Sequence, residues 1–212
     1  TTTGTFDNWI SGGTSPASYS YYVDVDPNDY SVAGWDTQTG TQRRVLRYAT
    51  GGALVAGWTT VTTGNLFWRR TISDPPGPIK VLPDSKVLVT GQFIANGPAS
   101  VNKRFNAAVL DTSGVLVPGY DPGIVATGTG LLDVRDGKHY LGAAIAATNA
   151  RTMPFVALRE ADGGYSSEFL TEPYVNPAAT AVGVTATVSM VRMLPDGRAY
   201  IGGRFATLGG GI

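Results

Sequence analysis

The sequence contains no cysteine and a single histidine, His139. Without cysteine the chain has no disulfide framework, no thiolate nucleophile and no cysteine-ligated zinc site. One histidine also excludes a metal centre that is built from several histidines of the same chain. We therefore expect no cofactor and no bound metal.

Charge is scarce as well. Charged residues make up 15% of the chain, and 16 basic residues balance 16 acidic ones, so the formal net charge is +0. Such a chain lacks the basic surface that binds nucleic acid or an anionic membrane. No apolar run approaches the roughly 18–20 residues of a membrane span. Because the sequence has neither an initiating methionine nor a leader pattern, we expect that Thr1 is not the natural start of the gene product.

Glycine and proline, in contrast, are abundant, with 28 and 13 residues in a chain of 212. Hydrophobic residues account for 42% of the chain, which is enough for a sizeable core. This composition disfavours helices and suits many short strands joined by tight turns. It predicts an all-β fold.

One pattern occurs three times: an apolar lead-in, an Asp-(Gly/Ser)-basic turn, and a short apolar strand that ends in glycine. The turns of the three copies contain Asp84, Asp136 and Asp196, and a fainter copy spans residues 26–34. Asp-Gly between apolar runs is a strong hairpin signal. The copies are spaced by roughly 50–60 residues, which is typical of repeat architectures.

A second landmark accompanies the first. It is a glycine that is followed six residues later by an aromatic residue. The pairs are Gly52 and Trp58, Gly114 and Tyr120, and Gly163 and Phe169. An aromatic residue that recurs at the end of each unit predicts a core position. We expect Trp58, Tyr120 and Phe169 to occupy equivalent, mostly buried sites.

Together the landmarks predict a single repeat domain over residues 1–212. Its expected units are 1–21 (partial), 22–60, 61–121, 122–170 and 171–212 (partial). Strands are expected near 20–26, 30–35, 44–49, 78–83, 86–93, 105–111, 139–144, 154–160, 189–194 and 198–204. No helix of three turns is expected within 130–212.

The segment 81–93, followed by 102–114, resembles the delta-60 β-propeller repeat. The pattern of that family is a PDGK-apolar-GG-F hairpin, an N-R-apolar-A-R-L-x-x-D-G strand and turn, and then an aromatic residue. Residues 193–205 match its first half equally well. The resemblance covers most of the chain from about Tyr22 onward. It implies a β-propeller-like array of four-stranded repeats that serves as a non-enzymatic scaffold in bacterial surface proteins and bacteriophage tail proteins.

The sequence departs from that pattern at residues 209–212, where the family continues into its third and fourth strands. About three full units plus partial ends are fewer than the four to eight blades of a closed propeller. We therefore expect either a piece of a longer chain or open ends that other chains cover, since a bare sheet edge invites aggregation. By analogy to tail fibres, a homo-oligomer is expected, with a trimer favoured.

Three carboxylates near the start, Asp24, Asp26 and Asp29, suggest a calcium loop. The glycine and the distal glutamate of the full pattern are missing, and the segment coincides with the hairpin of the first unit. We interpret it as a turn.

No catalytic constellation is predicted. Glu160 aligns with Tyr48 and Asp111 of the other units, so its position tolerates unrelated side chains and suits a solvated turn. His139 lies in a hairpin strand where another unit carries Val87. We interpret both as structural residues.

The expected function is that of a virion structural and host-receptor-binding component of a bacteriophage tail, located in the extracellular virion. A bacterial secreted or surface propeller adhesin and a polysaccharide-degrading tailspike are the alternatives. Expected partners are other tail proteins and a bacterial surface receptor, without nucleic acid or membrane insertion. Binding residues usually lie on loops over a rigid scaffold. Candidate receptor contacts are Tyr22, Trp35, Asn96, Asn102, Lys103 and Arg104.

Overall fold

The computed structural model describes residues 23–29, 31–37, 42–50, 53–55, 58, 67–68, 76–95, 104–126, 130–146, 152–164, 166, 187–196 and 198–204. Within these ranges the chain forms β-strands and no helix. Every strand pair is antiparallel. The all-β prediction is confirmed, and a strand is found at each position where the sequence predicted one.

The strands form three sheets. The first contains β1 (Val23–Val25), β2 (Val32–Thr37), β3 (Gln42–Tyr48), β4 (Phe67–Trp68), β5 (Pro76–Val81), β6 (Val87–Ala95) and β7 (Arg104–Leu110). The second contains β8 (Val125–Ala126), β9 (Gly130–Arg135), β10 (Lys138–Ala146) and β11 (Thr152–Arg159), and the third contains β12 (Thr187–Met193) and β13 (Ala199–Arg204). The sequence did not predict β4, β8 or β9.

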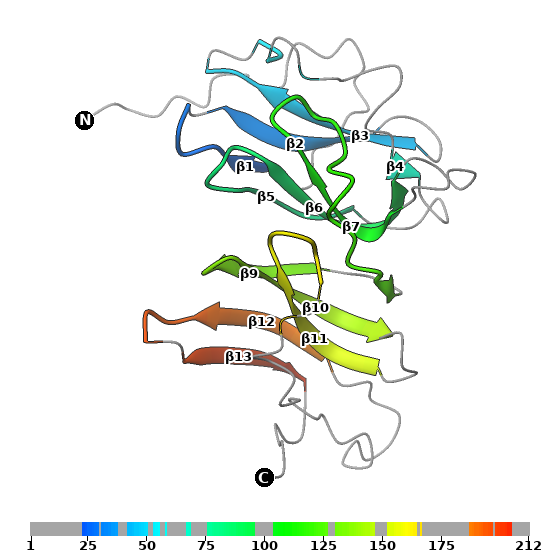
Figure 1. The fold of residues 1–212 in the computed structure, drawn as a ribbon, viewed down its shortest axis with the longest axis vertical. Coiled ribbons are helices and arrows are strands. Elements are labelled where there is room, and N and C mark those ends of the chain that lie inside the picture. The colour runs from blue at the N-terminus through cyan, green and yellow to red at the C-terminus, as the bar shows by residue number, and fades with distance from the viewer. Residues whose placement is uncertain are drawn as a thin grey trace.

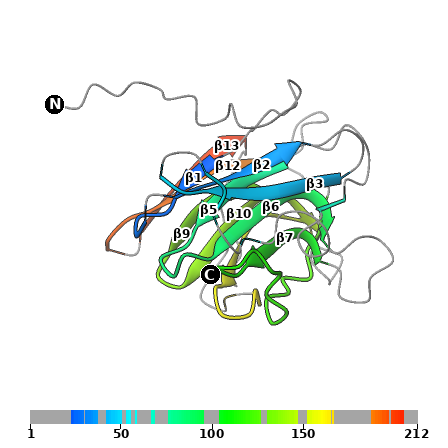
Figure 2. The same ribbon diagram turned by 90° about the horizontal axis from the view of Figure 1, so that it is seen from above.

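Most of these strands belong to consecutive antiparallel groups. We call β1–β3 meander 1, β5–β7 meander 2, β9–β11 meander 3, and β12–β13 hairpin 4. The first strands of the groups contact one another in chain order, β1 with β5, β5 with β9, and β9 with β12. Figure 1 shows the four groups following one another along the long axis, and they overlap when seen from above in Figure 2.

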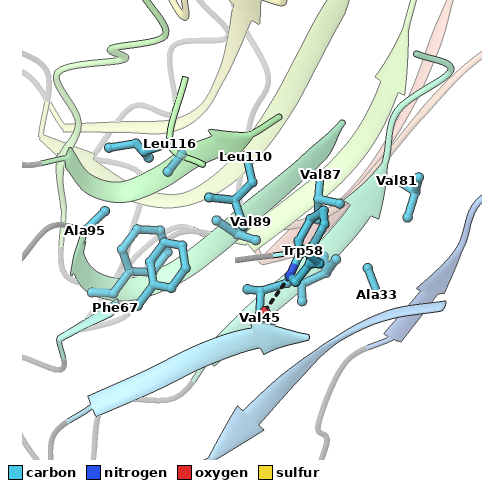
Figure 3. Packing of buried hydrophobic residues seen from close by; sticks show 13 residues of the cluster. Ala33, Val45, Trp58, Phe67, Val81, Val87, Val89, Ala95, Leu110 and Leu116 are labelled. Atoms are coloured by element: carbon cyan, nitrogen blue, oxygen red, sulfur yellow. Dashed lines mark hydrogen bonds between the residues drawn. The ribbon is translucent and has the colours of Figure 1, made fainter. Parts of the chain in front are cut away.

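Meander 2 is buried on both faces, because successive side chains of a strand point to opposite sides of the sheet. Val87 and Val89 of β6 pack with Ala33 and Val45 of meander 1 (Figure 3). Leu88 lies in a second cluster, together with Val109 and Tyr120 and against Val134 of meander 3. We call the face toward the preceding group the upstream face and the face toward the following group the downstream face.

The hairpins differ in detail from the sequence alignment. Asp136 and Gly137, with φ of 51° and 68°, form a two-residue turn that joins the paired Arg135 and Lys138. The hairpins at Asp84 and Asp196 are wider. There the closing pairs are Val81 with Val87 and Met193 with Ala199. The expected common turn is therefore wrong for Asp136.

The sequence suggested that the second strand of a group ends at its glycine, but in meanders 2 and 3 this strand continues beyond it. β6 continues past Gly91 to Ala95, and β10 continues past Gly142 to Ala146. The pairing register shifts near both glycines, between Thr90 and Ile94 and between Gly142 and Ile145. Such bulges redirect a strand. Beyond them the strand ends pair with two-residue strands, β4 on β6 and β8 on β10.

Candidate functional site

Arg47 of β3 and Asp26, in the turn after β1, form an ion pair inside the protein. Arg47 is 3% exposed and Asp26 is 0% exposed. The guanidinium donates through Nη2 to Asp26 Oδ2. It also donates through Nε to Ser31 Oγ at 2.7 Å and through Nη1 to Ser85 O at 2.8 Å. One side chain thus joins the first hairpin of meander 1 to that of meander 2.

Local turn chemistry positions the acidic partners. Asp26 Oδ1 accepts a hydrogen bond from Asn28 N at 2.8 Å, and Asp29 Oδ1 accepts one from Ser31 N at 2.8 Å. Such side-chain to backbone bonds stabilise Asx turns. Hydrogen bonds from Ser31, and then the charge of Arg47, hold the pKa of Asp29 below its ordinary value. The turn interpretation of this segment agrees with these bonds.

The three carboxylates do not converge on one point. Asp26 faces Arg47, whereas Asp24 Oδ2 accepts a hydrogen bond from Val81 N at 2.7 Å and pairs with Lys80 Nζ at 3.0 Å. Among the described residues, no group of three or more His, Cys, Asp or Glu side chains is arranged to hold a metal ion.

A second acidic residue repeats the role of Asp24 farther along the chain. Asp133 Oδ2 accepts a hydrogen bond from Met193 N at 3.0 Å, and Asp133 Oδ1 lies 3.9 Å from Arg192 Nη1. Thus β1 is joined to β5, and β9 to β12, by a carboxylate that binds both a backbone N–H and a basic side chain. Charge-assisted bonds of this kind fix the position of one group of strands on another.

Tyr120 and His139 form the polar part of the junction between meanders 2 and 3. The tyrosine hydroxyl and His139 Nδ1 share a hydrogen bond of 2.8 Å. Tyr120 is 1% exposed and His139 is 0% exposed. His139 Nε2 has no hydrogen-bond partner among the residues that the structure describes. Burial lowers the pKa of His139 to about 4, and burial also raises the pKa of Tyr120.

The buried histidine makes stability depend on pH. Its folded pKa of about 4 lies below the ordinary value of 6.5, so the unfolded chain binds the proton more tightly. The stabilisation from neutral His139 is fully present above pH 6.5 and is lost as the pH falls toward 4. The expected loss over this window is about 3 kcal/mol of unfolding free energy, which urea denaturation at a series of pH values would measure.

His139→Asn is the matched control, because its amide oxygen takes the place of Nδ1 and accepts the Tyr120 hydroxyl without titrating. Buried and paired carboxylates contribute equally to both proteins, so the difference between the two pH profiles isolates the histidine. Parallel profiles between pH 6.5 and 4 would show that His139 is solvated.

Trp58 and Tyr120 have the same local surroundings. Trp58 N donates to Val55 O and Tyr120 N donates to Val117 O, three residues earlier in both cases. A β-bridge precedes each aromatic residue, Tyr48 with Leu54 and Leu110 with Leu116, and the two bridged residues are the same distance apart in sequence in both cases. Trp58 is 4% exposed and Tyr120 is 1% exposed. Phe169 lies outside the described residues, as does Gly52.

Gly114 and Gly163, the two landmark glycines that the structure describes, each pack closely against residues from earlier in the chain. A Cβ at Gly114 would lie 2.8 Å from Trp58 Cε2, and a Cβ at Gly163 would lie 3.0 Å from Pro122 N. Both glycines have positive φ, 79° and 73°. Glycine is thus required at these positions for its backbone conformation and for its lack of a side chain.

Gly114→Ala tests this packing against a control with the same backbone strain. Gly123 also has positive φ, 58°, but nothing lies within 4 Å of its Cβ direction. We expect Gly114→Ala to destabilise the protein by about 1–3 kcal/mol more than Gly123→Ala, because only the first overpacks the Trp58 ring. Equal losses in thermal denaturation would mean that Trp58 does not pack on Gly114.

The expected alignment of Glu160 is wrong. Ser166 N donates to Ala157 O, nine residues back, whereas Val117 N donates to Val109 O, eight residues back. The third turn thus contains one additional residue, which the sequence alignment did not show. Arg159 rather than Glu160, and Ala49 rather than Tyr48, occupy the position of Asp111.

Few of the candidate receptor contacts lie in the described part of the chain. Trp35 is a residue of β2 and pairs with Val45. Arg104 is the first residue of β7 and pairs with Ala95. Tyr22, Asn96, Asn102 and Lys103 lie outside the described residues.

Comparisons with protein-family models, with curated proteins and with solved structures found no match for this chain. In the described ranges, no helix has the length and apolar character that a membrane span requires.

Proposed function

We propose that this chain is a directional array of propeller-like repeat units that acts as a rigid scaffold for host attachment on a bacteriophage tail. The observation that carries the proposal is the stacking of meander 2 between meanders 1 and 3. The contacts that hold this stack are the hydrogen bond from Arg47 to Ser85 O and the packing of Trp58 at one junction, and the Tyr120–His139 pair at the other. In this proposal each repeat supplies one sheet and covers its neighbours.

The non-enzymatic part of the proposal draws on how the ionisable side chains are used. Asp26 and Arg47 neutralise each other inside the protein, and His139 is shielded from solvent. Asp24 and Asp133 are bound to backbone N–H groups of a following group of strands. These groups stabilise the stacking, so the recognition chemistry is left to loops, as on other rigid β-scaffolds.

Attachment to a tail rests on the resemblance of 81–93 and 193–205 to the delta-60 repeat, whose members include bacteriophage tail proteins. The bacterial surface adhesin draws on the same resemblance. Immunogold electron microscopy separates the two, with an antibody raised against the purified chain and applied to phage lysates and to intact cells of the source strain.

Gold at the distal end of tails, together with binding of the purified chain to host cells, would support the proposal. Gold confined to the surface of cells would favour the adhesin. Release of reducing ends from purified capsule or lipopolysaccharide would instead identify a depolymerase and contradict the scaffold role.

A further inference from the structure

The four groups share one register position, which alternates in charge along the stack. It is a residue of the first strand of each group, and the residue paired with it on the second strand is the one compared below. The four pairs are Asp24 with Ala33, Lys80 with Leu88, Asp133 with Tyr140, and Arg192 with Tyr200. The first-strand residue is therefore acidic, basic, acidic and basic in turn.

Two of the possible contacts between oppositely charged members are formed. Asp24 pairs with Lys80 at 3.0 Å across the first junction, and Asp133 approaches Arg192 at 3.9 Å across the third. After Arg192, a further sheet that continues the pattern must carry an acid at this position. Meander 1 of this same chain carries one, Asp24.

The second-strand members of these pairs show which sheet is uncovered. Ala33 is 0% exposed, Leu88 is 0% exposed and Tyr140 is 2% exposed, whereas Tyr200 is 63% exposed. Leu88 belongs to the cluster between meanders 2 and 3. Gly202 lies two residues after Tyr200 on the same strand, and its partner Met190 is 54% exposed. The downstream face of hairpin 4 thus exposes Tyr200 at a position that is buried in the earlier groups, and it exposes Met190 as well.

The opposite end of the stack has the complementary surface. Val25 closes the first hairpin of meander 1, as Val81 closes that of meander 2, and Leu54 forms the same bridge as Leu116. Val81 and Leu116 are 3% and 7% exposed and belong to the core between meanders 1 and 2. Val25 and Leu54, in contrast, are 48% and 49% exposed. Within the described residues, the upstream face of meander 1 exposes two positions that are buried one step later.

We infer that two copies of this chain associate head to tail, with the downstream face of hairpin 4 of one copy against the upstream face of meander 1 of the other. The inference rests on the proposed array. Both faces are halves of the junction that already occurs inside the chain, where Val81 and Leu116 of meander 2 are buried against meander 1. Figure 1 shows hairpin 4 and meander 1 at opposite ends of the long axis, so a second copy is required. Repetition of this heterologous contact gives a ring where the rotation closes, and a filament otherwise.

The test is analytical ultracentrifugation of the complete chain at micromolar concentrations. The unmodified protein should sediment as a dimer or larger species, with a mass that depends on concentration. Tyr200→Asp and Val25→Asp should each raise the dissociation constant about tenfold or more, because each places a charge in an apolar contact. Val115→Asp is the matched control, since Val115 is 43% exposed in a turn outside both faces, and it should associate like the unmodified protein.

Mixing the two interface variants identifies the kind of contact. A Tyr200→Asp copy keeps an intact upstream face, and a Val25→Asp copy keeps an intact downstream face. An equimolar mixture should therefore recover association, although only to the heterodimer. Association of Val25→Asp alone as strongly as the unmodified protein would instead indicate that two hairpin 4 faces pair symmetrically, and would overturn the inference.

A folded protein that stays monomeric at these concentrations would also overturn it. Further units of a longer polypeptide or another tail protein would then be the occupants of the two faces. Binding of such a monomer to host cells would leave the proposed attachment function standing, so failure of the inference and failure of the function are distinguishable.

Discussion

Replacing Asp26 by alanine is expected to lower the free energy of unfolding by about 3–5 kcal/mol. The substitution leaves the Arg47 guanidinium 3% exposed without its main counter-charge. An unpaired charge in the core costs far more than the net stabilisation from the pair, since its desolvation is no longer compensated. Urea denaturation of the two proteins at neutral pH would measure the difference.

Two controls separate burial from charge. Asp196→Ala removes a partner of Arg198 at 2.6 Å, but both side chains are exposed, so the change should be far smaller. The double variant Asp26→Ala, Arg47→Met removes both charges and should recover much of the loss, because an apolar replacement of a buried pair is often close to neutral. A loss for Asp26→Ala no larger than that for Asp196→Ala would contradict the buried position of Arg47.

Tyr120→Ala is the second substitution with a large expected effect, about 3–5 kcal/mol of unfolding free energy. The side chain is 1% exposed and packs with Leu82, Leu88 and Val109. Its removal leaves a cavity between meanders 2 and 3 and takes away the hydrogen-bond partner of His139. Thermal or urea denaturation gives the measurement.

Tyr120→Phe keeps the ring and loses only the hydroxyl, so it should cost about 1 kcal/mol. The ratio of the two losses reports how much of the stabilisation comes from packing. An unchanged melting temperature for Tyr120→Ala would place the residue at the surface, and its correspondence with Trp58 would then be wrong.

The sequence predicted the strands well where an apolar run follows the recurring Asp-containing turn, as in 87–95 and 138–146. It missed β4 and β8 because two residues, such as Phe67 and Trp68, contain no periodicity. It did not predict β9 (Gly130–Arg135), although it marked the turn at Asp136 and Gly137 that ends this strand.

Side-chain partners were less accessible from sequence than strands. Arg47 meets Asp26 only because Ala33 pairs with Arg47, and nothing local to either residue indicates that register. Tyr120 meets His139 across two sheets that stack without sharing a strand pair. The recurring aromatic landmark did indicate that position 120 is buried, and the alternation of Asp24, Lys80, Asp133 and Arg192 is a pattern that a correct strand register reveals.

The order of the stack is the central claim, and distances between spin labels test it most directly. Because the chain has no cysteine, single pairs of cysteines can be introduced at exposed hairpin positions, namely Pro27, Pro83, Asp136 and Pro195. Electron paramagnetic resonance of labelled chains, diluted with unlabelled protein, should give distances from position 27 that increase in the order 83, 136 and 195. A distance from 27 to 195 that is shorter than that from 27 to 136 would contradict the stacked array.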